Sequence, residues 1–408
     1  MSLSQRNKMI ILFLTAADIS EINTSSLFKD LIRKFIKEGH KMYVVNPAER
    51  RNGEKTRVFE SGGATILKVR TLNITRANVI EKGVGTVLLE GQFYRAVRKY
   101  FADVKFDLVL YTTPPITFNK IINRIKKKYG IPSYLMLKDI FPQNAVDLGM
   151  FKAGSFFYKH FRKKEKTLYE ISDYIGCMSP ANVRYVINHN PEVERSKVEL
   201  CPNSIDIPAN KIFPDKEKIK AELDIPSDAM LFVYGGNLGK PQGIDFLLEV
   251  LKTNADMEDR FFLIIGRGTE YNKIKSWIET SKVSNVRLLP FVPKEKYNYI
   301  VSSGDVGMVF LDKRFTIPNF PTRIMGYLLH RMPILFATDS ATDVGKIVEE
   351  NGCGFWVESG QLNEFNEKIE YFVNNRSEMP RMQENAFHLL EEKYDVSVTY
   401  NAIMSHFA

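Results

Sequence analysis

Cysteine is scarce in this chain of 408 residues, which contains only Cys177, Cys201 and Cys353. An odd number with no Cys-x-x-Cys pair provides neither a disulfide framework nor a zinc knuckle, so we expect a reducing, cytoplasmic compartment. The six histidines are scattered without metal-ligand spacing, and the sequence contains neither a Gly-x-Ser-x-Gly motif nor a Gly-x-x-x-x-Gly-Lys-Ser/Thr P-loop. The sequence therefore predicts no metal site and disfavours serine hydrolases and P-loop kinases.

Long hydrophobic runs are absent as well. The longest apolar stretch, Met9–Ala17, is interrupted by a threonine and is much shorter than the roughly 20 residues that span a bilayer. It follows Arg6 and Lys8, as the core of a secretory signal does. The next segment, however, has the pattern of an amphipathic helix followed by a second apolar strand. We therefore interpret the stretch as the first strand of a folded β-α-β unit.

Short apolar runs that alternate with helical segments dominate the chain. The predicted strands are 10–14, 42–45, 64–69, 108–111, 133–137, 174–177, 198–200, 231–234, 261–265, 286–289, 306–310, 334–337 and 354–357. The predicted helices between them include 24–38, 244–253, 271–280, 294–301, 322–330 and 342–350. Strands that alternate with helices indicate parallel sheets with helices on both faces.

We predict an α/β fold of two doubly wound, Rossmann-like domains that face a central cleft. The length corresponds to two or three domains at about 150 residues each. The segment 202–214, with three prolines and two asparagines, interrupts both patterns. We therefore assign residues 1–207 to an N-terminal domain and 208–385 to a C-terminal domain. Residues 386–408 are predicted to form a last helix that packs back on the N-terminal domain.

Positive charge is concentrated in the first half of the chain. Residues 1–207 contain 34 Lys and Arg against 20 Asp and Glu, a balance of +14, whereas the whole chain carries +9. Such asymmetry favours contact of this half with a nucleic acid, a membrane surface or an anionic substrate, and a solvated basic surface is the alternative. Nucleic-acid binding is disfavoured because no aromatic residues are interleaved in a recognisable module.

Two segments of this half combine aromatic and basic residues. Residues 155–170 read as a helix in which Phe156, Phe157 and Phe161 are interspersed with five basic residues, and 120–129 adds five more. Aromatic rings interleaved with cations suit the headgroup region of an anionic leaflet. We therefore predict peripheral binding to an anionic membrane surface. The alternative is that the rings pack into the core and the lysines are solvated.

The most specific stretch is Tyr-Gly-Gly-Asn-Leu-Gly-Lys-Pro-Gln-Gly at 234–243, which follows the first strand of the second domain and opens a helix. Glycines let a backbone approach a phosphate closely, and a helix N-terminus supplies unpaired N–H groups and a positive dipole. A tight strand-to-helix turn is the alternative. The candidate ligand-binding residues of this loop are Gly236, Asn237, Gly239, Lys240 and Gly243.

Two further segments are expected at the same edge of the second sheet. Gly266-Arg267-Gly268 follows the next predicted strand, and the carboxyl ends of parallel strands share one edge. The segment 318–323 enters the helix predicted at 322–330, with Thr322 as its N-cap. Arg323 is then a second phosphate ligand or a structural ion-pair partner.

Six segments give the chain, over nearly its whole length, a resemblance to a known family. It resembles a family 4 glycosyltransferase of the two-Rossmann-domain (GT-B) type, and especially the branch that builds bacterial capsule and O-antigen (lipopolysaccharide) repeat units on a lipid carrier. The order and spacing of the segments make the match specific. They are Glu-Gly-His at 38–40, Lys-Asp-Ile-Phe-Pro-Gln at 138–143, Cys-Pro-Asn-Ser-Ile-Asp at 201–206, the loop at 235–243, Gly-Arg-Gly at 266–268 and Pro-Phe-Val at 290–292.

The resemblance implies a hexosyltransferase-type reaction. A sugar passes from a nucleotide-diphosphate sugar, expected to be a UDP-sugar, to a lipid-linked or saccharide acceptor. It also implies retention of anomeric configuration, no metal or other cofactor, an N-terminal domain that binds the acceptor and a C-terminal domain that binds the nucleotide sugar. The expected location is the inner face of the plasma membrane.

The resemblance also implies roles for individual residues, according to their positions in the family's motifs. Asn237 and Lys240 match contacts to the diphosphate, and Phe291 and Val292 match the segment that frames the base. Asp139 stands where the first domain presents a polar residue to the donor sugar and acceptor. Its alternative role is to cap the turn that precedes Pro142. We predict Asp139, Lys240 and Arg323 as catalytic residues.

One departure from the family pattern concerns two glutamates that are commonly eight residues apart. Pro318 and Gly326 occupy those positions here, so contacts to the sugar and the ribose are in doubt. The sequence therefore also fits a noncatalytic partner of an active transferase. A sugar-nucleotide epimerase on the same architecture is a weaker alternative because it requires acid/base carboxylates and histidines that we cannot place.

Overall fold

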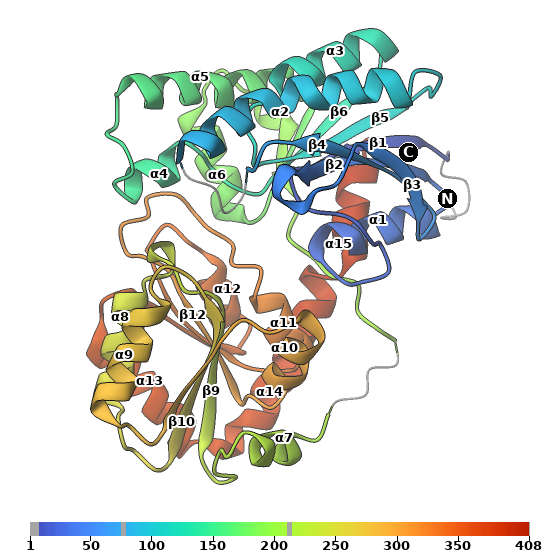
Figure 1. The fold of residues 1–408 in the computed structure, drawn as a ribbon. Helices are drawn as coiled ribbons and strands as arrows, with labels where there is room; N and C mark the ends of the chain where they lie inside the picture. Colours follow the sequence, from blue (N-terminus) through green and yellow to red (C-terminus); the bar gives the residue numbers. More distant parts are fainter. Residues whose placement is uncertain (1–7, 75–78, 210–213, 408) are drawn as a thin grey trace. The chain divides into compact units, whose positions relative to one another are not determined.

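A computed structural model of the chain describes residues 8–74, 79–209 and 214–407 (Figure 1). The chain divides into two compact units, which are described separately. Unit 1 comprises Met1–Asp206 together with Asp395–Ala408, and unit 2 comprises Ile207–Tyr394. The chain therefore leaves unit 1 once, forms unit 2 without interruption, and returns to unit 1 with its last residues.

Unit 1 is built on an eight-stranded sheet with the order β3-β4-β2-β1-β5-β6-β7-β8. All neighbours are parallel except β3, which pairs antiparallel with β4. The central strand β1 pairs with both β2 and β5, which confirms that the N-terminal apolar stretch is a folded strand. The strands are β1 (Ile10–Leu14), β2 (Lys41–Glu49), β3 (Arg57–Ser61), β4 (Ala64–Thr71), β5 (Leu108–Thr112), β6 (Ser133–Leu137), β7 (Tyr174–Cys177) and β8 (Val198–Leu200).

Helices cover both faces of this sheet, with α2, α3 and α5 side by side on one face and α1 and α15 on the other (Figure 1). The returning helix α15 packs on α1, where the Tyr400 hydroxyl lies 3.0 Å from His40 Nε2 and its ring meets Phe35 edge-on. The helices are α1 (Leu27–Lys37), α2 (Val79–Tyr100), α3 (Asn119–Tyr129), α4 (Gln143–Asp147), α5 (Phe156–Ile171), α6 (Pro180–His189) and α15 (Val396–Met404).

The ends of α1 show how local sequence sets an element. Ser26 is the N-cap residue, but its side chain does not cap the helix; instead Asp30 reaches back and accepts a 2.9 Å hydrogen bond from the Ser26 N–H. This carboxylate satisfies a backbone donor and suits the positive end of the helix dipole. After the helix, Gly39 has a φ of +92°, a conformation that glycine adopts without strain.

Unit 2 is built on a six-stranded, all-parallel sheet with the order β11-β10-β9-β12-β13-β14. The strands are β9 (Met230–Asn237), β10 (Arg260–Arg267), β11 (Val286–Leu289), β12 (Val306–Phe310), β13 (Ile334–Thr338) and β14 (Gly354–Glu358). The helices are α7 (Lys216–Glu222), α8 (Ile244–Thr253), α9 (Tyr271–Ser281), α10 (Lys294–Val301), α11 (Ile324–Leu329), α12 (Val344–Glu350), α13 (Leu362–Asn374) and α14 (Met379–Lys393). The prediction of two parallel-sheet, Rossmann-like domains is thus confirmed.

Three details differ from the sequence-based expectations. Strand β3 was not predicted, because Arg57–Ser61 lacks an apolar run and its side chains are largely exposed. Residues 386–393 do not belong to a terminal helix on unit 1; they complete α14 in unit 2, and the terminal helix begins only at Val396. Strands β9 and β10 continue beyond the predicted ends into Asn237 and Arg267, because the two strands keep pairing through their glycines.

Candidate functional site

The two glycine turns of unit 2 pack directly against each other. In the register of β9 and β10, Gly266 lies opposite Gly236, and the Leu238 N–H donates a 2.8 Å hydrogen bond to the Arg267 carbonyl. A Cβ atom at Gly266 would lie 1.9 Å from the Gly236 carbonyl oxygen, and one at Gly268 would lie 2.2 Å from the Leu238 oxygen. The glycines of the second turn are therefore required by close backbone packing.

The first glycine turn continues into a short 3-10 turn that leads to α8. Gly243 precedes α8 with a φ of +57°, and no side chain caps the helix, so its first N–H groups lie next to the loop. Asn237 Nδ2 donates to Gln242 Oε1 over 2.6 Å and thereby holds the two ends of the loop together. The Lys240 side chain is exposed at the middle of the loop. The structure thus places an exposed lysine in the loop that precedes a helix N-terminus.

Arg323 lies beneath this loop and is partly buried. Its guanidinium carbon is 4.5 Å from the centroid of the Tyr234 ring and 3.3 Å from the position that a Cβ would take at Gly236. Its Nη1 atom is buried and has no hydrogen-bond partner among the described residues. Burial acts to lower the pKa of Arg323, but the surrounding tyrosines, Tyr234 and Tyr327 foremost, outweigh it and raise that pKa above its usual value. A partly buried guanidinium whose buried Nη1 donor is unused favours an anionic ligand.

Three tyrosines hold the backbone of the first turn in place. The Tyr327 hydroxyl accepts a 3.0 Å hydrogen bond from the Gly235 N–H, and the Tyr234 hydroxyl donates to the Asn237 carbonyl over 2.7 Å. The Tyr297 hydroxyl packs on Gly235, where a Cβ would be only 2.1 Å away. Sequence reasoning missed Tyr297 and Tyr327, because nothing in their spacing shows that α10 and α11 direct them to the same turn.

Arg267 and Phe291 meet at the carboxyl ends of β10 and β11. The guanidinium carbon of Arg267 lies 4.0 Å from the centroid of the Phe291 ring, and 57% of the Phe291 residue surface is exposed. Val292 beside it is partly buried. An aromatic ring that is stacked on a cation and open to solvent provides a platform for a planar group. The structure therefore brings together two of the predicted ligand-binding segments.

The predicted N-cap Thr322 is wrong. Helix α11 begins at Ile324, with Arg323 at the cap position. The first N–H groups bond to backbone carbonyls three residues earlier, Ile324 to Pro321 and Met325 to Thr322, so the Thr322 hydroxyl has no capping role. The Thr322 side chain is exposed next to Arg323.

A carboxyl group that sequence reasoning missed lies close to the loop that contains Pro318. Asp339 follows β13 and accepts hydrogen bonds from the Thr342 N–H (2.8 Å) and hydroxyl (3.0 Å). The Thr342 hydroxyl in turn accepts the Asn319 N–H over 3.0 Å. Burial raises the pKa of Asp339 to about 6, against the opposing effect of the bonds from Thr342. Gly326, the second position of the absent glutamate pair, lies inside α11.

Asp139 belongs to unit 1, whereas the other candidate residues belong to unit 2. Its Oδ1 accepts a 2.8 Å hydrogen bond from Asn144 Nδ2 in α4, and its backbone N–H donates to the Thr113 hydroxyl over 3.3 Å. The side chain thus fastens the turn after β6 to α4. These two bonds fit the alternative role of Asp139, in which it stabilises the turn next to Pro142.

Neither a metal-binding cluster nor a membrane-spanning helix is present in the described ranges 8–74, 79–209 and 214–407. These ranges contain no group of three or more His, Cys, Asp or Glu side chains arranged to hold a metal ion. No helix within them has both the length and the apolar character needed to cross a bilayer.

Comparison with known proteins relates unit 2 to a family of enzymes. Residues 215–389 match the family model of glycosyl transferases group 1. The probable glycosyltransferase WbjE of Pseudomonas aeruginosa is 23% identical over 256 residues, which are 61% of this chain and 62% of WbjE. The match therefore spans less than two thirds of that relative.

Solved structures share the fold across nearly the whole chain. Sucrose-phosphate synthase of Thermosynechococcus elongatus has a TM-score of 0.76 at 13% identity and covers 97% of this chain and 98% of its own. Anabaena HepE in complex with UDP-glucose has a TM-score of 0.70 at 14% identity, with coverage of 98% and 99%. WaaG, a glycosyltransferase involved in lipopolysaccharide biosynthesis, has a TM-score of 0.68 at 12% identity, with coverage of 97% and 99%. Residues 215–389 are thus similar to glycosyl transferases group 1, and the chain shares the fold of these solved structures.

Proposed function

We propose that this protein transfers a sugar from a nucleotide-diphosphate sugar, a UDP-sugar, to a lipid-linked or saccharide acceptor. The observation that carries the proposal is the buried Nη1 of Arg323 directly beneath Gly236, which has no partner among the described residues. A second cation, Lys240, and the uncapped N-terminus of α8 lie in the same loop. These cationic and dipolar groups together suit a diphosphate. Because one structural neighbour, HepE, was solved in complex with UDP-glucose, a UDP-sugar is the first candidate donor.

Each part of the site then has a chemical task. The departing UDP accumulates negative charge as the bond to the sugar breaks, and Arg323, Lys240 and the N–H groups of α8 stabilise that charge. Asn237 keeps the loop closed around the diphosphate. The exposed ring of Phe291, backed by Arg267 and flanked by Val292, receives the base. Within unit 1, Asp139 holds the turn after β6 through its bond to Asn144.

The finer assignments rest on the sequence resemblance. They are membership of family 4, retention of anomeric configuration without a metal or other cofactor, and a role in capsule or lipopolysaccharide synthesis at the cytoplasmic face of the plasma membrane. WaaG, one of the structural neighbours, is involved in lipopolysaccharide biosynthesis, which agrees with this choice of pathway class.

A thermal-shift screen of the protein against UDP, GDP, dTDP and ADP tests the proposal. A ligand that binds only the folded state raises the melting temperature, so UDP is expected to give the largest shift. Transfer is then measured with UDP-sugars and extracted lipid-linked acceptors. Absence of any stabilisation by the four nucleotides would contradict the proposed donor site.

A second candidate function is a noncatalytic partner of an active transferase. Pro318 and Gly326 favour it, because neither side chain can replace a glutamate contact to sugar or ribose. The two functions separate cleanly in experiment. A noncatalytic partner binds UDP but leaves UDP-sugars intact under every acceptor condition, whereas a transferase releases UDP when acceptor is added.

A further inference from the structure

Two of the three tyrosine hydroxyls at the first glycine turn are engaged in structural hydrogen bonds. The Tyr327 hydroxyl accepts the Gly235 N–H over 3.0 Å and donates to the Met308 carbonyl over 3.3 Å. The Tyr234 hydroxyl donates to the Asn237 carbonyl over 2.7 Å. Both hydroxyl protons are therefore used within unit 2, and neither is available to a ligand.

The Tyr297 hydroxyl differs from these two. It packs on Gly235, where a Cβ atom would lie only 2.1 Å from the hydroxyl oxygen, so the hydroxyl reaches the turn because the residue there is glycine. No group in the part of the chain that the structure describes forms a hydrogen bond with it. Burial raises the pKa of Tyr297, against the opposing effect of Arg323, so the hydroxyl keeps its proton at neutral pH. A partly buried hydroxyl with an unused proton suits an acceptor atom of a ligand.

This hydroxyl lies next to the unused donor of Arg323. Gly235 and Gly236 are consecutive residues of β9, and the Arg323 guanidinium carbon lies 3.3 Å from the position that a Cβ would take at Gly236. The charge of Arg323 acts on the Tyr297 hydroxyl, and its buried Nη1 has no partner among the described residues. Two unused donors at consecutive glycines suit one ligand with several acceptor oxygens, and a diphosphate is such a ligand.

Tyr297 is also connected through the backbone to the aromatic platform. The Phe291 residue is 57% exposed at the end of β11, and α10 begins three residues later at Lys294. Tyr297 lies in the first turn of α10, where its N–H donates to the Pro293 carbonyl over 2.8 Å. Strands β11, β10 and β9 are neighbours in the sheet. Residues 291–297 therefore run from the platform at the end of β11 to the glycine turn of β9.

We propose that the Tyr297 hydroxyl donates a hydrogen bond to a phosphate oxygen of the nucleotide, beside Arg323, so that residues 291–297 hold both ends of the ligand. Phe291 contacts the base at one end of this segment, and Tyr297 contacts the diphosphate at the other. This role rests on the proposed donor site and gives the diphosphate a third side-chain ligand besides Arg323 and Lys240. An O–H donor to a charged oxygen forms a shorter and stronger hydrogen bond than one to a neutral acceptor.

Isothermal titration of the full chain with UDP, uridine and pyrophosphate tests this role. Tyr297→Phe removes only the hydroxyl oxygen, so it should weaken the binding of UDP and of pyrophosphate about tenfold and leave that of uridine unchanged. Phe291→Ser removes the platform and should give the opposite pattern, with weaker binding of UDP and uridine and unchanged binding of pyrophosphate. The two variants together separate the contact to phosphate from the contact to the base.

Tyr299→Phe is the matched control. Tyr299 lies two residues further along α10, and its hydroxyl donates to Glu222 over 3.0 Å. The loss of this hydroxyl should leave all three affinities unchanged. The melting temperatures of the unliganded variants show that unit 2 remains folded, and Tyr297→Phe breaks no hydrogen bond within the described ranges.

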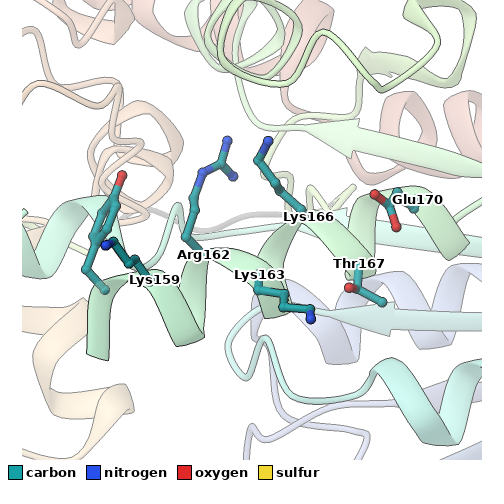
Figure 2. A pocket seen from close by; sticks show the side chains of 7 residues that line it. Lys159, Arg162, Lys163, Lys166, Thr167 and Glu170 are labelled. Atoms are coloured by element: carbon teal, nitrogen blue, oxygen red, sulfur yellow. The ribbon is translucent and has the colours of Figure 1, made fainter. Parts of the chain in front are cut away.

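Pyrophosphate is small enough to bind basic side chains elsewhere, so a second control concerns unit 1. Lys159 and Lys163 are exposed on α5 and line an open hollow of about 380 Å³ together with Arg162 and Lys166 (Figure 2). Lys159→Ala/Lys163→Ala should leave the affinity for pyrophosphate unchanged if this anion binds at the glycine turn. The comparison of UDP with uridine is independent of this hollow.

The role of Tyr297 is overturned if Tyr297→Phe binds UDP as tightly as the wild type, or if it loses as much affinity for uridine as for UDP. Such a result leaves the proposed function intact, because the wild type still binds UDP. A wild type that binds neither UDP nor pyrophosphate contradicts the proposed donor site and the role of Tyr297 together.

Discussion

Two cations, Lys68 in unit 1 and Arg323 in unit 2, show how differently the units use positive charge. Lys68 in β4 of unit 1 has no exposed side-chain surface, and its ammonium is paired with Asp18. Arg323 in unit 2 is partly buried beside Gly236, and its buried Nη1 atom has no partner among the described residues. The first is a completed structural contact, whereas the second keeps a hydrogen-bond donor without a partner among the described residues. A buried charge therefore indicates a binding site only when its hydrogen-bonding capacity is unused.

The distribution of net charge alone would place an anion-binding site in unit 1, whereas this comparison places the candidate site in unit 2. Residues 1–207 contain the excess of basic residues, with 34 against 20 acidic ones. The candidate diphosphate site nevertheless lies in unit 2, because one well-placed guanidinium and a helix N-terminus are more specific than many solvated lysines. The excess charge of unit 1 instead suits a diffuse anionic surface.

The largest expected effect concerns the packing of the two glycine turns. Gly266→Ala should lower the free energy of unfolding of unit 2 by about 3 kcal/mol, because its Cβ would meet the Gly236 carbonyl oxygen at 1.9 Å. Gly326→Ala is the matched control, since a Cβ there meets nothing within 4 Å, and it should raise stability by about 0.5–1 kcal/mol. Urea denaturation measures both; equal effects would contradict the packing argument.

The second prediction tests the contrast between the two cations. Arg323→Ala should weaken UDP binding about 10- to 100-fold, because it removes a charge-assisted contact worth about 1.5–3 kcal/mol. Its effect on the unfolding free energy should be limited to the loss of guanidinium packing on the Tyr234 ring, because the Nη1 atom has no hydrogen bond to lose within the described part of the chain. Isothermal titration with UDP and denaturation of the same sample measure the two quantities.

Lys68→Ala should give the opposite result. It removes a buried side chain and its pair with the exposed Asp18, so the unfolding free energy should fall by about 1–2 kcal/mol while UDP affinity stays the same. The comparison is contradicted if Lys68→Ala weakens UDP binding as much as Arg323→Ala does, because the paired cation would then matter for UDP as much as the one with an unused donor.

The third prediction uses the carboxyl group of Asp339. Burial raises its pKa to about 6 in the folded state, from 3.8, so the folded protein holds a proton that the unfolded chain has lost. The unfolding free energy should therefore fall as pH rises from about 4 to about 6, by on the order of 2 kcal/mol. Asp339→Asn should remove this part of the pH dependence, and Asp228→Asn, at an exposed site, should not. Urea midpoints across the pH range measure the difference between the variants; identical slopes for all three proteins would rule out this role.

The smallest expected effect belongs to Lys240. Because its side chain is exposed and partly solvated in the complex, Lys240→Ala should weaken UDP binding about tenfold, less than Arg323→Ala does. Lys252→Ala, at the far end of α8, is the control for loss of a lysine charge and should leave the affinity unchanged. Unchanged affinity after loss of Lys240, with the fold intact, would remove this residue from the site.

Much of the fold could be read from local sequence. The boundaries predicted for 10–14, 133–137, 174–177, 198–200, 286–289 and 306–310 coincide with strands of the structure. Most of these strands are buried on both faces, so their apolar runs end where the strand ends. Strand β3 was not predicted, because the side chains of this edge strand are largely exposed and form no apolar run.

The sequence predicted only part of the candidate site. The loop at 234–243 and the turn at 266–268 stand out because a cluster of glycines directly after a strand indicates a backbone that must pack closely or approach a ligand. Tyr297, Tyr327 and Asp339 could not be found, since their roles depend on contacts between elements distant in sequence. Thr322 was misplaced by one position because backbone carbonyls already satisfy the start of α11.

The sequence by itself determined the alternation of strands and helices, the glycine turns and the uneven charge, because each depends on neighbours within a few residues. Tertiary structure alone decided which cation is paired and which has an unused donor, and that Tyr297 and Tyr327 meet at the same glycine turn. The reason is physical: burial, desolvation and partner contacts arise only when segments far apart in the chain are packed together.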